Sequence, residues 1–527
     1  MLGRVAVIIM SRLDAHARRL SRLEDRLVVG TDAPTFEVPS LHTFLKDAWH
    51  VLEPATPFVD GWHLQCISEH LEAVTRGQIK RLLINVPPRF CKSTLVSVMW
   101  PVWSWLTNPS ISYLCASYAL SLAIRDNRKS RMLIQSPWFQ SRYGSAFRLS
   151  DDQNAKSYFE NDRRGYRMSV STGSSSTGFG GSVLLGDDLH AIDEKESVAA
   201  RESALDWFDT TFSTRLNSAD GAICVIGQRI HQADVSGHII EQGGWEHLNL
   251  PAEFEPTRRC FTPTLRWSDP RREEGELLWP DRFTRATLEQ QRRNLGSIAY
   301  ASLYQQSPVP AGGAIFRKEW LRYFSETDEA YLLETPSGNR GVLKSACWSF
   351  GTVDLAISSK TTADYTVIAV WAVTKERDLL LLDLIRGRFD FAEQQRQIEL
   401  IHQRYHLNYT KIETVAYQLA IAQQLLKKGV PVREYKPVKD KVSRASTAAI
   451  WYENGKMFHR RGVAWEADVE SELLMFPKGA HDDIVDVISL AADTVTSGYS
   501  QLDALSELQE RAAAREKIKQ MVADQYW

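Results

Sequence analysis

Apolar and polar positions fall into blocks that predict strands followed by helices. The run Leu82–Val86 is apolar and predicts a buried parallel strand. Pro87 and Pro88 end this strand, because proline has no backbone N–H to donate within a sheet. The segment 95–106 is mostly apolar and rich in tryptophan, which predicts a buried helix. A strand, a short loop and a helix therefore form the unit around which we interpret the chain.

The loop between this strand and this helix contains Lys92, Ser93 and Thr94. The backbone N–H groups of such a loop can hold phosphates, its lysine can reach the β- and γ-phosphates, and its serine can bind Mg²⁺. The Walker A pattern has glycine where this chain has Val86 and Cys91. On the loop alone, an ordinary strand–turn–helix with a surface lysine remains an alternative.

Two further apolar strands end in polar side chains. The first ends in Asp187 and Asp188, which predicts a Walker B pair. Asp187 would hold Mg²⁺ through water, and Asp188 would orient or deprotonate the attacking water. The second strand ends in Gln228 and Arg229. Because ligands bind at the carboxyl edge of an open α/β sheet, the three strand ends predict one nucleotide site.

Two polar side chains could complete this site. Arg89 lies inside the loop and could supply positive charge in the transition state of phosphoryl transfer, or it could be a surface arginine. Gln65, upstream of the loop strand, could bind an adenine edge, or it could be an ordinary helical glutamine.

The pattern changes after the segment 307–313, whose Pro and Gly residues predict a domain boundary. Strands predicted at 347–354, 364–373 and 379–386 form a meander, and helices and strands then alternate. This order is typical of an RNase H-like fold. The predicted fold class is therefore α/β, with a P-loop (ASCE/RecA-like) ATPase domain followed by an RNase H-like nuclease domain.

Carboxylates occupy three positions that this second fold would bring together. Asp354 ends the first strand and Glu413 lies on the fourth, predicted at 410–414, while Asp483 and Asp486 share one face of a final helix. Converging carboxylates can bind two divalent metals that stabilise the attacking and leaving oxygens of phosphodiester cleavage. Oxygen ligands suit Mg²⁺ or Mn²⁺ better than zinc. The neighbouring Asp482 is more typical of a helix N-cap.

A run of basic residues precedes this helix in the sequence. Such a run is usually a solvated face, but beside a nuclease site it could also follow a phosphate backbone. Its members are Arg433, Lys436, Lys439, Lys441 and Arg444.

Composition narrows the class of protein. A chain of 527 residues is too long for one core, so two large domains are expected. Its net charge of −2 means that any contact with nucleic acid must come from local basic clusters. The six cysteines form no CxxC pair, which argues against a zinc site or a disulfide framework and favours a reducing, cytoplasmic setting. No run is long enough to predict a membrane span.

Several motifs together resemble the large terminase subunit of tailed bacteriophages and prophages. The resemblance covers about residues 45–495, and a Pro-Pro-Arg-x-x-Lys-Ser loop is similar to that family's variant Walker A, which often lacks glycines. The motifs are Asn85–Ser93, Leu184–Asp188, Gly227–His231, Leu278–Pro280, Tyr304–Gln306, Asp354 and His481–Asp486.

The resemblance implies roles for individual residues. ATP would be bound by Gln65, Arg89, Phe90, Cys91, Lys92, Ser93, Thr94, Asp187, Gln228 and Arg229. Divalent metal would be held by Ser93 and Asp187 in the ATPase domain, and by Asp354, Glu413, Asp483 and Asp486 in the nuclease domain. The residues expected to act in catalysis are Arg89, Asp188, Asp354, Glu413 and Asp483.

The resemblance also implies an organisation and partners. We expect a helical arm at 1–40, an ATPase domain at 41–310, a linker at 311–345, a nuclease domain at 346–497 and a helical tail at 498–527. The expected partners are double-stranded DNA, a small terminase subunit and the portal protein of a procapsid, where the chain would form a pentameric ring in the host cytoplasm, without contact to a membrane. Two alternatives stay open: an RNase H-like resolvase or integrase with a degenerate, structural ATPase domain, and a scaffold without enzymatic activity.

Overall fold

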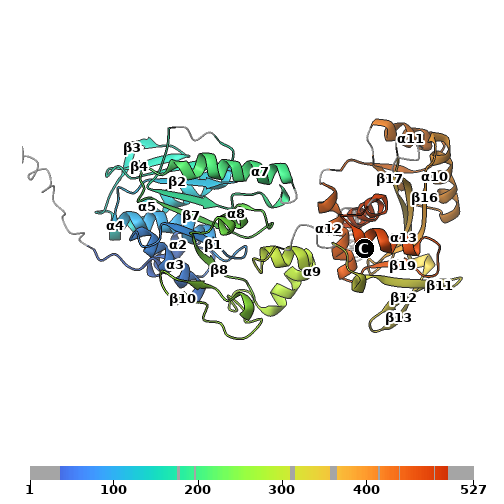
Figure 1. Cartoon of the computed structure of the whole chain (residues 1–527), viewed down its shortest axis with the longest axis horizontal. Helices are drawn as coiled ribbons and strands as arrows, with labels where there is room; N and C mark the ends of the chain where they lie inside the picture. The colour runs from blue at the N-terminus through green and yellow to red at the C-terminus, as the bar shows by residue number, and fades with distance from the viewer. Residues whose placement is uncertain are drawn as a thin grey trace, which may run out of the picture.

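The computed structural model describes residues 36–174, 178–194, 197–308, 315–356, 365–413, 416–437, 440–479 and 481–496. These residues form two α/β bodies, each built around one large sheet (Figure 1). The blue-to-green body contains the N-terminal sheet, and the orange-to-red body contains the C-terminal sheet. The predicted tail at 498–527, and nearly all of the predicted arm at 1–40, lie outside the described residues.

The N-terminal sheet has eight strands within the described residues. In spatial order they are β3 (Leu149–Asn154), β4 (Tyr158–Asn161), β5 (Tyr166–Ser171), β2 (Tyr113–Ser117), β6 (Val183–Asp187), β7 (Ala222–Gly227), β1 (Arg81–Asn85) and β8 (Glu246–Asn249). Neighbours run parallel from β5 onward in this order, whereas β3, β4 and β5 pair antiparallel.

The strands that carry the predicted nucleotide site end at the same level. Strand β7 lies between β1 and β6, with Asn85 paired to Gly227 and Ile226 paired to Asp187. The loop after β1 and the acids at the end of β6 therefore reach the same edge of the sheet from either side of β7. This arrangement confirms the predicted P-loop α/β fold.

Helices cover both faces of this sheet, because side chains alternate along each strand. Leu82 and Ile84 pack into one core with the helices before and after the loop, and Leu83 packs into a second core with Val235 and Ile239 on the opposite face. The helices are α2 (Leu41–Leu52), α3 (Trp62–Thr75), α4 (Trp100–Thr107), α5 (Leu120–Gln135), α6 (Pro137–Tyr143), α7 (Val198–Asp206), α8 (Val235–Gln242) and α9 (Arg285–Leu303), with a small hairpin of β9 (Phe261–Thr262) and β10 (Trp267–Ser268).

The C-terminal sheet has nine strands in the described part of the chain. In spatial order they are β13 (Gly338–Leu343), β12 (Ala330–Thr335), β11 (Arg322–Glu326), β19 (Met457–Arg460), β16 (Leu379–Gly387), β15 (Thr366–Val373), β14 (Trp348–Asp354), β17 (Thr410–Glu413) and β18 (Val432–Tyr435). The meander β14–β15–β16 is antiparallel, and β17 adds parallel to β14. The order β16-β15-β14-β17-β18 confirms the predicted RNase H-like fold.

One predicted boundary does not match the structure. The segment 311–345 is predicted to be a linker, but β11, β12 and β13 lie within it and extend the C-terminal sheet beyond β19. Their short, half-exposed strands carry weak alternation, so the sequence pattern does not separate them from a loop. Residues 311–314, at the start of this segment, lie outside the described residues.

Helices α10 (Phe391–Tyr405), α11 (Ala416–Lys427), α12 (Lys441–Glu453), α13 (Glu466–Met475) and a helix at residues 483–496 accompany this sheet. The two bodies touch where α9 is kinked at Gly296, which has a φ of 74°. There the backbone N–H of Ser297 donates to Glu453 of α12 at 2.8 Å. Among the described helices, none is both long and apolar enough to cross a membrane.

Candidate active sites

The loop after β1 adopts a backbone that glycine normally supplies. Arg89 and Cys91 have positive φ values of 70° and 63°, a region that costs a residue with a side chain about 1–2 kcal/mol. The chain then enters a π-helix at Ser93–Met99 before α4 begins. Such π-turns are frequent at functional sites. The loop therefore makes the turn of a phosphate-binding loop without the usual glycines, at a cost in backbone strain.

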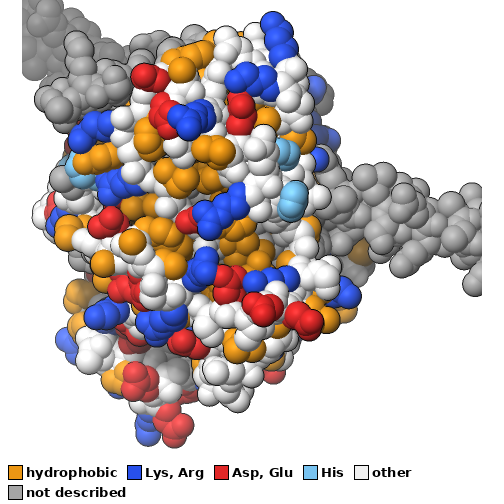
Figure 2. Space-filling model, turned by 90° about the vertical axis from the view of Figure 1, so that its right-hand side faces the viewer, with side chains coloured by type: hydrophobic (Ala, Val, Ile, Leu, Met, Phe, Trp, Pro, Cys, Tyr) orange, Lys and Arg blue, Asp and Glu red, His pale blue; other side chains and the backbone are white. Residues whose placement is uncertain are grey.

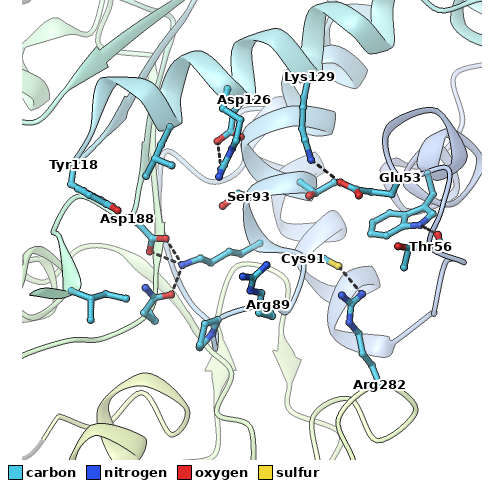
Figure 3. Close-up of a pocket in the computed structure, with 18 of the residues that line it drawn as sticks. Glu53, Thr56, Arg89, Cys91, Ser93, Tyr118, Asp126, Lys129, Asp188 and Arg282 are labelled. Carbon is cyan, nitrogen blue, oxygen red and sulfur yellow. Dashed lines mark hydrogen bonds and ion pairs between the residues drawn. The ribbon is translucent and has the colours of Figure 1, made fainter. Parts of the chain in front are cut away.

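This loop forms one wall of a pocket of about 490 Å³ (Figure 3). Loop residues and both strand-end residues Asp188 and Gln228 line it. The lining residues are Trp49, Glu53, Thr56, Pro88, Arg89, Cys91, Lys92, Ser93, Thr94, Tyr118, Leu122, Arg125, Asp126, Lys129, Asp188, His190, Ile192, Gln228 and Arg282.

The side chain of Lys92 joins the three strand ends. It is buried, and its Nζ donates to both carboxylate oxygens of Asp188 at 2.6 and 2.5 Å. It also donates to Oε1 of Gln228 at 2.5 Å. The cation of the loop therefore contacts the acid after β6 and the amide after β7 directly, as the sequence predicted from their positions.

Asp187 has the properties of a Mg²⁺ ligand. One of its oxygens accepts a hydrogen bond from Ser97 Oγ at 2.6 Å, and the other, Oδ1, is buried without a hydrogen-bond partner in the described structure. Burial and the charge of Asp188 raise the pKa of Asp187 to about 7. A buried, unsatisfied carboxylate oxygen beside a second acid suits a divalent cation. The sequence did not predict Ser97, whose only signal is that it lies one turn beyond Ser93.

Four residues predicted to bind the nucleotide do not line this pocket: Asp187, which lies beside it next to Asp188, and Gln65, Phe90 and Arg229, whose side chains have other partners. The side chain of Gln65 donates to Glu69 at 2.9 Å. Phe90 is fully buried and stacks on Phe283, with 4.5 Å between the ring centroids. The guanidinium of Arg229 donates to both oxygens of Asp234, the residue that caps α8.

Phe90 and Arg229 stand next in sequence to pocket residues, but their side chains take structural positions. Phe90 fixes the loop onto the core, and Arg229 fixes the start of α8. Their position in the sequence next to pocket residues therefore led to the prediction of two nucleotide contacts, whereas their side chains point away from the pocket.

The other end of the pocket is built from residues that the sequence did not predict. Trp49 Nε1 donates to the carbonyl of Thr56 at 2.7 Å, and Lys129 of α5 donates to Glu53 at 2.6 Å. Arg282 lies over the Trp279 ring at 5.0 Å, and its Nη1 is 3.9 Å from the Cys91 sulfur. Figure 3 shows Glu53, Thr56 and Arg282 on the side of the pocket opposite Asp188. These residues come from separate segments of the chain, and only tertiary packing brings them together at this wall of the pocket.

The predicted nuclease acids converge at one edge of the C-terminal sheet. Val353 pairs with Ile412, so Asp354 and Glu413 end neighbouring strands. Burial raises the pKa of Asp354 to about 8, and the charges of Asp486, Glu413 and Asp483 act in the same direction. Asp354 is therefore close enough to the other three carboxylates to be affected by their charges.

Two basic residues from the first turn of α12 neutralise part of this cluster. Lys441 Nζ lies 2.6 Å from both Asp482 Oδ1 and Asp486 Oδ2. Arg444 Nη2 lies 2.9 Å from the other oxygen of Asp486 and 3.8 Å from Glu413. Among the described residues, no three His, Cys, Asp or Glu side chains stand as a ready metal site. The all-oxygen donor set and its mutual repulsion nevertheless fit a hard divalent cation.

The basic run therefore acts partly within the site. Lys441 and Arg444 face the acids, Arg433 lies over the Tyr409 ring at 4.0 Å, and Lys439 is outside the described residues. Figure 2 shows the right-hand side of the molecule as drawn in Figure 1, where basic and acidic side chains are interspersed.

Glu472 of α13, which the sequence did not predict, fixes the helix that carries Asp483. Its Oε1 accepts hydrogen bonds from the backbone N–H groups of Ile484 and Val485 at 2.6 and 3.3 Å. Arg386 of β16 lies 3.2 Å from Glu472 Oε2 and 3.6 Å from Asp483 Oδ2. The N-terminal N–H groups of this helix, which Asp482 was expected to cap, are therefore capped by Glu472, an acid distant in the sequence.

Comparison with known proteins places the C-terminal body in a family. Residues 351–493 match the family described as the terminase RNaseH-like domain. No curated protein matches the chain. The large terminase of a thermophilic bacteriophage, solved in complex with ADP, aligns over 86% of this chain and 99% of its own, with 11% identity and a TM-score of 0.43.

A second solved structure, the large terminase nuclease of the thermophilic phage G20c with bound magnesium, aligns over 35% of this chain and 98% of its own, with 19% identity and a TM-score of 0.26. The match of residues 351–493 to the terminase RNaseH-like domain confirms the resemblance to large terminases found in the motifs of the chain.

Proposed function

We propose that this chain is the motor and nuclease of viral DNA packaging. It hydrolyses ATP to move double-stranded DNA into a procapsid, and it cuts the concatemeric genome with divalent metal. The observation that carries the proposal is the meeting of Lys92, Asp188 and Gln228 at one pocket, in a chain that also contains a terminase RNase H-like domain.

In the ATPase domain, Lys92, Ser93, Thr94 and the N–H groups of the loop would hold the phosphates of ATP, and Asp187 would hold Mg²⁺. ATP supplies the phosphoanhydride bond, and Mg²⁺ neutralises its oxygens. Lys92 now donates to Asp188. A phosphate that takes over this lysine leaves Asp188 available to orient and deprotonate the attacking water.

Two further residues of the pocket have proposed roles. Gln228 contacts Lys92 from the end of β7, so it can transmit the state of the loop to the strand between β1 and β6. Arg89 is exposed and lines the pocket, where it would add positive charge to the transition state in cis.

In the nuclease domain, Asp354, Glu413 and Asp483 would hold Mg²⁺ or Mn²⁺, with Asp486 adjacent. The metal supplies Lewis acidity at the scissile phosphate. Glu472 and Arg386 keep the helix of Asp483 in place against β14, and Thr352 Oγ1 donates to the carbonyl of Val487 on that helix at 2.9 Å.

Partners follow from the same proposal. The chain would form a pentameric ring on the portal protein of the procapsid and receive DNA from a small terminase subunit in the host cytoplasm. The test is protection of linear DNA from DNase by portal-bearing procapsids, with ATP or with a non-hydrolysable analogue. Protection that requires hydrolysis supports the motor, and protection with the analogue contradicts it.

One observation favours a second candidate, an RNase H-like nuclease with a structural ATPase domain. The strained φ values of Arg89 and Cys91, together with the hold of Asp188 on Lys92, would suit a loop that binds no nucleotide. ATP turnover by the purified chain, with and without double-stranded DNA, separates the two. The packaging motor requires turnover that DNA stimulates, whereas the structural domain has none.

A further inference from the structure

The first turn of α12 has an unusual charge. It carries Lys441 and Arg444 and contains no acidic residue, although its cap, Asp440, accepts the backbone N–H of Ser443. The N-terminus of a helix bears partial positive charge, so two cations there are unfavourable. Their position must be stabilised by something outside the helix.

The acids of the nuclease site supply that stabilisation. Lys441 bridges Asp482 and Asp486, with 2.6 Å to each, and Arg444 lies 2.9 Å from the second oxygen of Asp486. Both oxygens of Asp486 are therefore held by α12. A divalent metal bound by Asp486 would compete with the Lys441 ammonium for the same carboxylate, because two cations at such short range repel each other.

Lys441 is better placed to move than Arg444. The side chain of Lys441 is 34% exposed, whereas that of Arg444 is 12% exposed and lies between Asp486 and Glu413. A lysine ammonium is a compact charge on a flexible stem, and an arginine fork is a rigid bridge. Release of Lys441 therefore leaves the helix contact of Arg444 in place.

Resting on the proposed nuclease function, we propose that Lys441 is a placeholder cation that becomes a DNA contact. Before metal and DNA bind, its ammonium neutralises Asp482 and Asp486. When divalent metal binds at the acid cluster beside Asp486, the ammonium moves to a phosphate oxygen of the DNA strand in the site, where lysine is a suitable partner. The same residue thus opposes metal binding without DNA and supports cutting with DNA.

The experiment measures Mn²⁺ binding by calorimetry on the full chain without DNA. The heat that disappears in Asp354→Asn identifies the nuclease site, which separates it from metal bound in the ATPase pocket. Loss of one ion pair corresponds to roughly tenfold in affinity. Lys441→Met is therefore expected to bind Mn²⁺ roughly tenfold more tightly than the wild type and, at saturating Mn²⁺, to cut plasmid DNA roughly tenfold more slowly.

Two variants provide matched comparisons. Lys441→Arg keeps the charge, so its Mn²⁺ affinity and its cutting rate are expected to stay close to those of the wild type. Lys344→Met removes a lysine of similar exposure, 33%, which pairs with Glu326 at 3.1 Å and lies away from the nuclease acids. This change should alter neither the Mn²⁺ affinity nor the rate of cutting. If Lys441→Met does not fold, which circular dichroism would show, Lys441→Gln takes its place with the same expectations.

The outcomes separate two failures. Mn²⁺ affinity that is unchanged or weaker in Lys441→Met, with a lower melting temperature, makes Lys441 a structural ion pair and overturns the inference alone. Unchanged cutting at saturating Mn²⁺ overturns the DNA contact. A wild type without Asp354-dependent Mn²⁺ binding overturns the proposed nuclease function as well.

Discussion

The two acid clusters of this chain differ in where their cations come from. In the ATPase pocket, Lys92 belongs to the loop that would bind phosphate, and it pairs with Asp188 while Asp187 bonds to Ser97. In the nuclease site, Lys441 and Arg444 come from a separate helix and hold Asp486. In the proposed function, the first cation would itself bind the ligand, whereas the second stands beside acids that a metal would use.

The comparison indicates that two lysine–aspartate ion pairs of the same kind can have opposite effects on ligand binding. In the proposed function, Lys92 would exchange one anion, the carboxylate of Asp188, for another, a phosphate, so its charge would be needed throughout. Lys441 holds a carboxylate that a divalent cation would use, so its charge would compete with the metal. Neutralising the lysine should therefore weaken nucleotide binding in one site and strengthen metal binding in the other.

The largest effect is expected from Asp354→Asn. This acid is half-buried among like charges, and its replacement would remove a proposed metal ligand. We expect a loss of several kcal/mol of transition-state stabilisation, or roughly 10³-fold in DNA cutting, with ATP turnover unchanged. Rates of plasmid cutting and of phosphate release, measured on the same preparation, check this. Equal loss of both activities would mean that the two sites are not separate.

Glu472 tests the positioning of the nuclease helix. Glu472→Ala removes the acceptor for two backbone N–H groups and the partner of Arg386, so we expect cutting at saturating Mn²⁺ to fall roughly tenfold. Glu472→Gln keeps a hydrogen-bond acceptor, so its cutting rate should lie between that of Glu472→Ala and that of the wild type. Single-turnover cutting with a Mn²⁺ titration distinguishes the two, and an unaltered rate in Glu472→Ala would show that the cap is dispensable.

The pH dependence of stability should differ between the wild type and Asp354→Asn. The pKa of Asp354 is raised from its ordinary 3.8 to about 8, so the folded state binds this proton more tightly than the unfolded state. Its contribution to stability is complete below pH 4 and is lost as the pH rises to about 8, with a slope of at most about 1.4 kcal/mol per pH unit.

Scanning calorimetry in EDTA between pH 6 and 9 measures this contribution. The transition of the C-terminal body should move to lower temperature as the pH rises in the wild type, and less so in Asp354→Asn. Parallel pH profiles of the two proteins would show that Asp354 does not titrate in this range.

The smallest effect is expected at Cys91. Its φ of 63° is one that glycine adopts freely. Cys91→Gly should therefore relieve strain of about 1 kcal/mol, partly offset by the greater freedom of glycine in the unfolded chain. Chemical denaturation measures the net change. A large gain in ATP turnover would show that the cysteine impairs the loop, and a loss of stability would contradict the strain.

The sequence predicted what depends on strand order and missed what depends on packing. Lys92, Asp188 and Gln228 each follow an apolar strand, and parallel strands bring such residues to one edge. Asp354 and Glu413 meet for the same reason. Three contacts depend on tertiary packing, and no spacing along the chain predicts them. They are Glu472 with the helix of Asp483, Ser97 with Asp187, and Lys129 with Glu53.

The predictions that the structure corrects have the same physical origin. Phe90 and Arg229 neighbour true pocket residues in the chain, yet their side chains point to Phe283 and Asp234. The strands within 311–345 are short and half-exposed, so their pattern resembles a loop. Strong local motifs therefore identified the residues that the structure brings together at two sheet edges, while the direction of each side chain needed the structure.

The most direct test of the account measures ATP turnover and metal-dependent plasmid cutting together in Lys92→Ala. The lysine contacts Asp188 and Gln228 and lies in the N-terminal body, away from Asp354. We predict that ATP turnover is abolished while cutting with Mn²⁺ continues at the wild-type rate. ATP turnover that survives this change would contradict the assignment of the loop as the phosphate-binding site.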